Sequence, residues 1–254
     1  MIYVCIPSHD EAKTVGLLLW KIRQVFADFP REYQLLVGDD ASGDSTREVL
    51  EPYAKVLPLE IIRTKQREGT AKTVERLLKL ALERTDRPKR DAAVVLHADF
   101  THAVTLLPEI IKKLDSGADL VVAEGQVAGG ETRGYRMLRR WGSHLLPRAA
   151  RPDGVHDALS GFIATRLITL RSALKASGEP LLRLDGWAAR AELIAKLGRQ
   201  ARRTDVVAAP ERLDLRERPS RLDPWEEAKA LWRARAALRD LPPPRAAGDR
   251  DEAA

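Results

Sequence analysis

The stretch QLLVGDDASGDST, residues 34–46, shows the pattern that governs the first half of the chain. A short apolar run ends in two aspartates, and small hydroxyl-bearing residues lead from there into an amphipathic segment. A strand that is nearly all apolar is typical of a parallel sheet whose two faces are both covered by helices. The stretch therefore predicts one strand–loop–helix unit of an α/β sheet, with polar side chains just beyond the strand.

Units of the same kind lie on either side of this stretch. Short apolar runs predict strands at 2–6, 34–37, 59–62, 92–96 and 120–123, and amphipathic segments predict helices at 11–27, 45–53, 70–84 and 106–114. This alternation indicates an α/β fold with a mostly parallel central sheet and helices on both faces. Further on we expect a loop of small residues at 157–164, helices at 166–175, 187–197 and 224–240, and a strand at 205–208.

Composition and charge narrow the class of protein. The 254 residues are 44% hydrophobic and 31% charged with one cysteine, which excludes collagen-like, coiled-coil and disulfide-rich classes. The net charge of +6 is uneven, because residues 1–128 carry 18 basic and 20 acidic side chains and residues 129–254 carry 25 and 17. An excess of basic side chains bears on which partners a protein attracts and does not indicate its fold. Nucleic-acid binding is not expected, because no nucleic-acid motif or aromatic platform is present.

Apolar run lengths bear on localisation. No run approaches the roughly 18 apolar residues of a membrane span, so we expect no transmembrane segment. Residues 1–7 lack the basic start of a secretory leader and are interpreted as the first strand. A cytoplasmic protein is therefore expected, with Cys5 as a buried thiol in a reducing compartment.

Polar side chains follow three of the predicted strands, where open α/β sheets bind their ligands. The pair Asp39–Asp40 is costly at the end of an apolar run unless its charges find partners. Carboxylate oxygens there suit the base and ribose of a nucleoside, with helix capping as the alternative. Neither dinucleotide-binding nor P-loop glycine motifs occur. Asp99, after the fourth strand, can instead hold a divalent cation that grips a diphosphate, or it can cap the next helix.

The order of these motifs resembles that of family-2 glycosyltransferases with the GT-A fold, and most of all the dolichyl-phosphate mannosyltransferase type. The resemblance rests on IPSHDE (6–11), VGDDASGDST (37–46), EGTA (68–71) and HADFTH (97–102). It continues in GVHDALSGF (154–162), similar to the V-x-D-x-x-[ST]-G-[SF] segment of that type, and more weakly in RPSR (218–221). It thus covers about residues 1–222.

The resemblance implies a nucleotide-sugar site built from Pro7, His9, Glu11, Asp39, Asp40, His97 and Asp99. In it, Asp39 and Asp40 lie near the base and ribose, and Asp99 is the metal-binding acid of a D-x-D motif that holds Mg²⁺ or Mn²⁺. His97 stands in place of the first Asp of that motif and is a departure from the usual pattern.

An arginine cluster marks the second half of the chain. Residues 132–152 contain six arginines and no acid, and Arg133, Arg136 and Arg140 are spaced to share one helical face. Such a face is either solvated or binds an anion, namely a phosphorylated acceptor or lipid headgroups. The resemblance implies Arg136, Arg140 and Ser143 as acceptor- or phosphate-binding residues, through an Arg-x-x-Ser motif. Gln126 departs from an arginine usual in the type.

Asp157 is the candidate catalytic base. A hydroxyl acceptor needs a base to remove its proton, whereas a phosphate acceptor attacks unaided and would leave Asp157 to orient groups or support the metal. A loop-capping role is the alternative.

These expectations describe an inverting, metal-dependent glycosyltransferase that uses a nucleotide-sugar donor. The acceptor favoured is a polyprenyl phosphate at the cytoplasmic membrane face, reached by a protein that is peripheral on that face. A soluble acceptor, or a non-catalytic nucleotide-sugar-binding module, is the alternative. We expect a catalytic domain over 1–222, an amphipathic helix over 223–240 and a disordered tail over 241–254. Glu226 and Glu227 favour docking of that helix on the catalytic domain over a place in a membrane interface.

Overall fold

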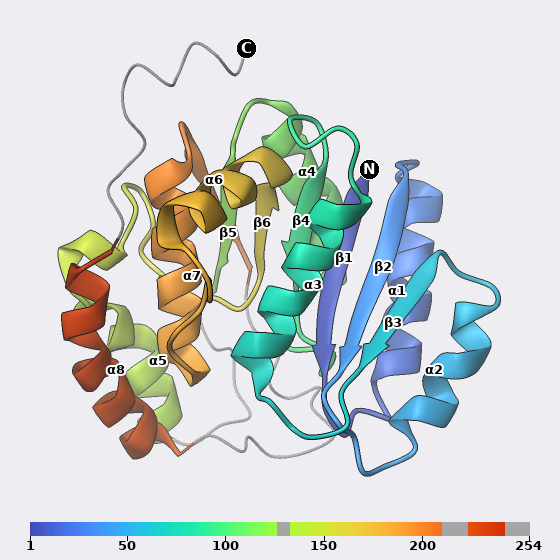
Figure 1. The fold of residues 1–254 in the computed structure, drawn as a ribbon, viewed down its shortest axis with the longest axis horizontal. Coiled ribbons are helices and arrows are strands. Elements are labelled where there is room, and N and C mark those ends of the chain that lie inside the picture. The colour runs from blue at the N-terminus through green and yellow to red at the C-terminus, as the bar shows by residue number, and fades with distance from the viewer. Residues whose placement is uncertain (126–132, 210–222, 242–254) are drawn as a thin grey trace.

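The computed structural model describes residues 1–125, 133–209 and 223–241 (Figure 1). Its described strands form one sheet in the order β3-β2-β1-β4-β6-β5-β7. Their bounds are β1 Ile2–Ser8, β2 Tyr33–Asp39, β3 Leu59–Arg63, β4 Ala92–Val95, β5 Leu120–Glu124, β6 Ile163–Arg166 and β7 Thr204–Ala208. Strands β3, β2, β1 and β4 are mutually parallel, as are β5 and β7, while β6 runs antiparallel to both of its neighbours.

Helices cover both faces of the sheet, as the apolar strands predict. One face packs against α1 (Val15–Asp28), α2 (Thr46–Ala54) and α4 (Leu107–Asp115), the last preceded by the short 3-10 helix Val104–Leu106. The other face packs against α3 (Thr70–Arg84), α6 (Leu167–Ser177) and α7 (Gly186–Gln200). Neighbouring residues of β1 point to opposite faces, so Val4 lies in the first core and Cys5 in the second. Burial raises the pKa of the Cys5 thiol, consistent with the expected inert side chain.

The elements of the first half lie close to their predicted positions, and α3 has the predicted bounds 70–84. The predicted loop over 157–164 is wrong at its end, because residues 163 and 164 belong to a strand. It ends at Ile163, where β6 begins and inserts between β4 and β5, with Ala164 opposite both Val94 and Val121. A four-residue strand held by neighbours on both sides needs no long apolar run of its own, so its small residues gave no strand signal.

A third layer consists of α5 (Arg133–Leu145), the 3-10 helix Arg148–Ala150 and α8 (Pro224–Arg239), which pack against α7 (Figure 1). Asp223 caps α8, since its carboxylate accepts hydrogen bonds from the backbone of Trp225 and Glu226. Leu231 and Leu238 are buried, so the predicted docking of this helix is confirmed. Gln126, the RPSR segment at 218–221 and residues 242–254 of the expected tail lie outside the described residues.

Within the described ranges, the structure contains no helix with the length and apolar character required to cross a membrane.

Glu75 of α3 joins the helix to the segment that enters α7. Its carboxylate accepts hydrogen bonds from the backbone N–H of Leu181 and Leu182, both at 2.9 Å, and pairs with Lys79 at 2.9 Å. Burial by itself raises the pKa of Glu75, but the N–H groups of Leu182 and Leu181 together with Lys79 outweigh it and lower the pKa. The ionised carboxylate therefore stabilises the fold.

We expect Glu75→Gln to lower the free energy of unfolding at pH 7 by about 1–3 kcal/mol, because it leaves buried donors poorly matched. A carboxyl group whose pKa is lowered in the folded state stabilises above its unfolded pKa of about 4.3 and loses this effect as the pH falls. The difference between the variant and the parent should therefore shrink below about pH 4. Urea unfolding of both proteins at pH 7 and at acid pH measures this difference in the free energy of unfolding.

Glu179→Gln is the matched control, since Glu179 also pairs with Lys79, at 3.1 Å, but its side chain is 80% exposed. It should cost under about 1 kcal/mol. Equal losses in the two variants would contradict a structural role for Glu75.

Candidate active site

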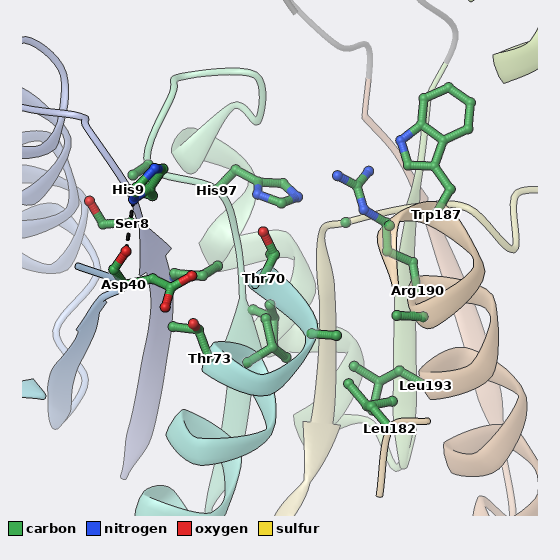
Figure 2. Close-up of a pocket in the computed structure, with 18 of the residues that line it drawn as sticks. Ser8, His9, Asp40, Thr70, Thr73, His97, Leu182, Trp187, Arg190 and Leu193 are labelled. Atoms are coloured by element: carbon green, nitrogen blue, oxygen red, sulfur yellow. Dashed lines mark hydrogen bonds between the residues drawn. The ribbon is translucent and has the colours of Figure 1, made fainter. Parts of the chain in front are cut away.

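A cavity opens at the carboxyl ends of β1 and β4, between the starts of α3 and α7 (Figure 2). Segments distant in sequence share its wall: the loops after β1, β2 and β4, the first turns of α3, the approach to β6, and the first turns of α7. This is the edge at which open α/β sheets bind ligands.

The structure brings most of the predicted nucleotide-sugar residues together here. The cavity wall includes Pro7, His9, Glu11, Asp40, His97 and Asp99. Asp39 is absent from the wall as far as the described residues define it. Its side chain lies 3.7 Å from Arg63 Nε and accepts a hydrogen bond from the backbone of Ser42 at 3.2 Å. Asp39 thus stands behind the wall, with its charge already paired.

Asp40 fixes the start of α3. It is 3% exposed, and its carboxylate accepts the backbone N–H groups of Glu68 and Gly69, both at 2.8 Å, and the Thr64 hydroxyl at 3.2 Å. Gly69, which caps α3, has φ +96°, a conformation that favours glycine. The next residue, Thr70, enters the cavity wall. The partners that a buried aspartate pair requires are therefore supplied by the loop before α3 and by Arg63.

The loops after β1 and β2 brace each other. Asp10 accepts a hydrogen bond from the backbone of Gly43 at 2.8 Å, and its own N–H donates to the Ser42 hydroxyl at 3.0 Å. His9 Nδ1 lies 2.7 Å from the carbonyl oxygen of Asp40. These contacts hold the His9 ring at the cavity edge.

Left-handed backbone conformations recur in the three loops that follow β1, β2 and β4. Asp10 and Ala41 have φ of 53° and Phe100 has φ of 58°. Such conformations cost about 1–3 kcal/mol for residues other than glycine and persist where surrounding contacts enforce them, often at functional sites. Surrounding contacts therefore enforce the conformation of all three loops at the cavity edge.

His97 and Asp99 follow β4 on the cavity wall. Asp99 accepts hydrogen bonds from the backbone and the hydroxyl of Thr101, at 3.1 and 2.5 Å. The His97 ring lies 5.2 Å from that of His102. Across the cavity, Arg190 of α7 faces His97 (Figure 2). Gly161 makes this approach possible, because a Cβ there would clash with His97 Nε2 and lie 3.2 Å from Arg190 Cζ.

The metal-binding side chains of the cavity wall fit a divalent cation that is held partly by the protein and partly by a bound diphosphate. Over the described ranges there is no cluster of three or more His, Cys, Asp or Glu side chains suited to a metal ion. Mg²⁺ is commonly bound by one or two carboxylates together with substrate phosphates, so Asp99 is sufficient as the protein carboxylate beside a diphosphate.

Several wall residues were missed by sequence reasoning. Thr70, Ser160 and Gly161 lie within the quoted motifs but were given no role, whereas Trp187 and Arg190 were read only as part of a helix. Trp187 is 1% exposed, stacks edge-on against Tyr135 of α5 at 5.2 Å, and donates its backbone N–H to Glu227 of α8 at 3.2 Å. Burial, opposed by the Trp187 N–H and Arg190, raises the pKa of Glu227.

The predicted acceptor residues are dispersed over α5. Arg136 and Arg140 are exposed on its outward side, and Ser143 is buried, with its hydroxyl accepting the N–H of Ala158 at 3.1 Å. As far as the wall is described, none of the three lines the cavity. Arg139 turns inward, on the helical face shared with Tyr135, and this periodicity was available in the sequence.

Asp157 forms a two-pronged ion pair with Arg139, whose side chain is 2% exposed. Arg139 Nη2 lies 2.7 Å from Asp157 Oδ2, and Nη1 contacts Oδ1. The Asp157 carboxylate also accepts the N–H of Leu159 at 3.0 Å. A buried arginine needs such a partner, so Asp157 organises the loop that leads to Ser160 and Gly161.

Comparisons with known proteins agree with this architecture. The family model described as glycosyl transferase family 2 matches residues 3–178. Dolichol-phosphate mannosyltransferase of Pyrococcus furiosus is 29% identical over 168 residues, which cover 64% of this chain and 45% of that protein. The chain spans about half the length of the first curated relatives that it matches.

Two solved structures resemble the fold over nearly the whole chain. Mannosyl-3-phosphoglycerate synthase from Rubrobacter xylanophilus has a TM-score of 0.66 at 20% identity, covering 98% of this chain and 78% of its own. Glucosyl-3-phosphoglycerate synthase from Mycobacterium tuberculosis, in complex with Mn²⁺, uridine-diphosphate-glucose and phosphoglyceric acid, has a TM-score of 0.59 at 20% identity, covering 94% and 78%. The family match shows that the chain belongs to glycosyl transferase family 2, and the sheet order and the solved structures show that it has the GT-A fold.

Proposed function

We propose that the protein is an inverting, metal-dependent glycosyltransferase that moves a sugar from a nucleotide-diphosphate donor to a phosphate-bearing acceptor. The observation that carries the proposal is the convergence of Asp40, His97, Asp99 and Arg190 on one cavity at the carboxyl edge of the sheet. Family membership supports the transferase class, and the cavity supports a ligand that carries both a nucleoside and a charged diphosphate.

The donor nucleoside lies along Pro7, His9 and Glu11 in this proposal. Glu11 is 7% exposed, and its carboxylate accepts the Thr14 hydroxyl at 2.8 Å, which orients it at the cavity edge. In the proposal, Asp40 contacts the base or ribose, and Asp39 supports the loop behind the wall through its hydrogen bond from Ser42. Fixed acceptors of this kind suit the N–H and O–H groups of a nucleoside.

The diphosphate would lie near Asp99, which would hold Mg²⁺ or Mn²⁺ with His97 beside it. When bound, the cation supplies positive charge that neutralises the departing diphosphate. Arg67 and Arg190 also reach the cavity, and their guanidinium groups stabilise negative charge that develops on the leaving group.

A phosphate acceptor is favoured because its oxygen needs no base, and Asp157 is engaged with Arg139. Asp157 then orients the wall, whereas with a hydroxyl acceptor it would serve as the base. A polyprenyl phosphate at the cytoplasmic membrane face is the first candidate, supported by the mannosyltransferase relative. Arg136, Arg140 and Ser143 are proposed as acceptor-side residues. A soluble phosphorylated acceptor ranks second, supported by the fold shared with the phosphoglycerate enzymes.

We expect Asp99→Asn to lower turnover by at least about 100-fold, because the variant loses charge stabilisation of the leaving group. Release of nucleoside diphosphate from a panel of donors, with and without Mg²⁺ or Mn²⁺, measures this. Asp86→Asn is the control, since the Asp86 side chain is 85% exposed, pairs with the neighbouring Arg87 and is not among the described residues of the cavity wall. Its turnover should stay near that of the parent.

Unchanged, metal-dependent turnover in Asp99→Asn would contradict the mechanism. Tight donor binding with neither hydrolysis nor transfer to any acceptor would instead identify a non-catalytic nucleotide-sugar-binding module.

We expect Asp157→Asn, assayed with a phosphate acceptor, to lower kcat less than about tenfold and to keep the acid limb of the pH–rate profile. Loss of a general base would cost roughly 100- to 10,000-fold and remove that limb. Because the variant unpairs Arg139, its melting temperature is measured alongside. If the folded variant instead lost kcat by roughly 100-fold or more, Asp157 would be the general base.

A further inference from the structure

The outward sides of α5 and α8 carry most of the large apolar side chains that the described chain exposes. These are Met137 and Trp141 on α5, 67% and 53% exposed, and Trp225 and Trp232 on α8, 69% and 61% exposed. We call this surface the α5–α8 face. Exposed apolar groups concentrated in this way mark an interaction surface.

The exposed tryptophans are not needed to dock α8. Trp225 and Trp232 are seven residues apart, two helical turns, and so point the same way. The opposite side of the helix buries Leu231, Ala234 and Leu238. Helices α5 and α8 lie side by side, since a Cβ at Gly142 of α5 would sit 3.5 Å from Leu231 Cδ1. The tryptophans thus remain as surface after the fold is complete.

Basic side chains are interleaved with the aromatic ones. Arg235 Cζ lies 4.4 Å from the centroid of the Trp232 ring, Arg140 Cζ 5.3 Å from that of Trp141, and Lys229 Nζ 5.7 Å from that of Trp225. Helix α5 contains no acid, and Glu226, which pairs with Lys229 at 2.8 Å, is the one exposed acid within α8 as the structure describes it. The face is therefore both aromatic and strongly positive.

We propose that the α5–α8 face docks on an anionic lipid bilayer. Tryptophan rings settle at the level of lipid headgroups, while arginine and lysine side chains reach the phosphates. A second copy of this chain fits less well, because a two-fold interface would set the two positive faces against each other. An anionic bilayer complements both the exposed indole rings and the exposed basic side chains of the face.

The opposite sides of the same two helices support the cavity. Tyr135 of α5 and Glu227 of α8 both contact Trp187, which lines the cavity. A docked bilayer would therefore lie one layer of helices from the cavity wall, where a lipid-linked phosphate acceptor needs to arrive. The inference deepens the proposed function and rests on it for this purpose.

Sedimentation with vesicles tests the proposal without any turnover. We expect the full chain to partition onto phosphatidylcholine vesicles that contain phosphatidylglycerol, and to leave them as salt rises. The double variant Trp225→Ser/Trp232→Ser should lower the partition coefficient at least about tenfold, because each indole buries a large apolar area. The double variant Arg233→Gln/Arg239→Gln, which removes two exposed arginines of α8, should lower it about fivefold per charge.

Trp20→Ser is the matched control. Trp20 is 46% exposed on α1, which lies at the other end of the molecule from α8 (Figure 1), and its loss should leave partitioning unchanged. Donor hydrolysis by all three variants should match the parent and shows that they are folded.

Three results would overturn the proposal: no preference for the phosphatidylglycerol vesicles, equal partitioning of the double tryptophan variant and Trp20→Ser, or a dimer in light scattering that the double variant abolishes. Partitioning without sugar transfer would remove the proposed function and leave the docking surface. Transfer to a lipid acceptor without partitioning would support the proposed function and exclude the docking surface.

Discussion

The buried carboxylate of Asp40 is the constraint on which the cavity depends. A charge at the end of an apolar strand must be compensated inside the protein, and here the backbone N–H groups of Glu68 and Gly69, just before α3, compensate it. This contact fixes the start of α3 against the end of β2 and sets Thr70 in the wall. The same residue offers its backbone oxygen to His9, so one aspartate aligns two of the loops that surround the ligand site.

The remaining wall is assembled across the sheet by close contacts. Gly161 leaves the room in which His97 of one segment approaches Arg190 of another. Trp187 contacts Tyr135 of α5 and Glu227 of α8, so the C-terminal helix takes part in the architecture of the site. The Arg139–Asp157 pair orders the intervening loop, because an unpaired guanidinium would be costly at that depth.

The uneven charge of the chain acquires a structural meaning in this arrangement. The slightly acidic first half supplies the strand-end carboxylates of the cavity, and much of the basic excess of the second half lies on the outward faces of α5 and α8. Arginines that form one cluster in the sequence therefore have different roles. Arg139 is buried and pairs with Asp157, whereas Arg136 and Arg140 are exposed to solvent.

The sequence by itself determined the alternation of strands and helices, the carboxyl edge as the place of the site, and the polar side chains that follow three of the strands. These follow from local patterns, since burial of a strand and capping of a helix are decided within a few residues. The insertion of β6, the pairing of Arg139 with Asp157 and the arrival of Trp187 and Arg190 in the cavity were decided by the tertiary structure alone. Each depends on partners distant in sequence, since Asp157 is 18 residues from Arg139 and Val94 is 70 residues from Ala164. A local sequence pattern does not specify partners so far apart.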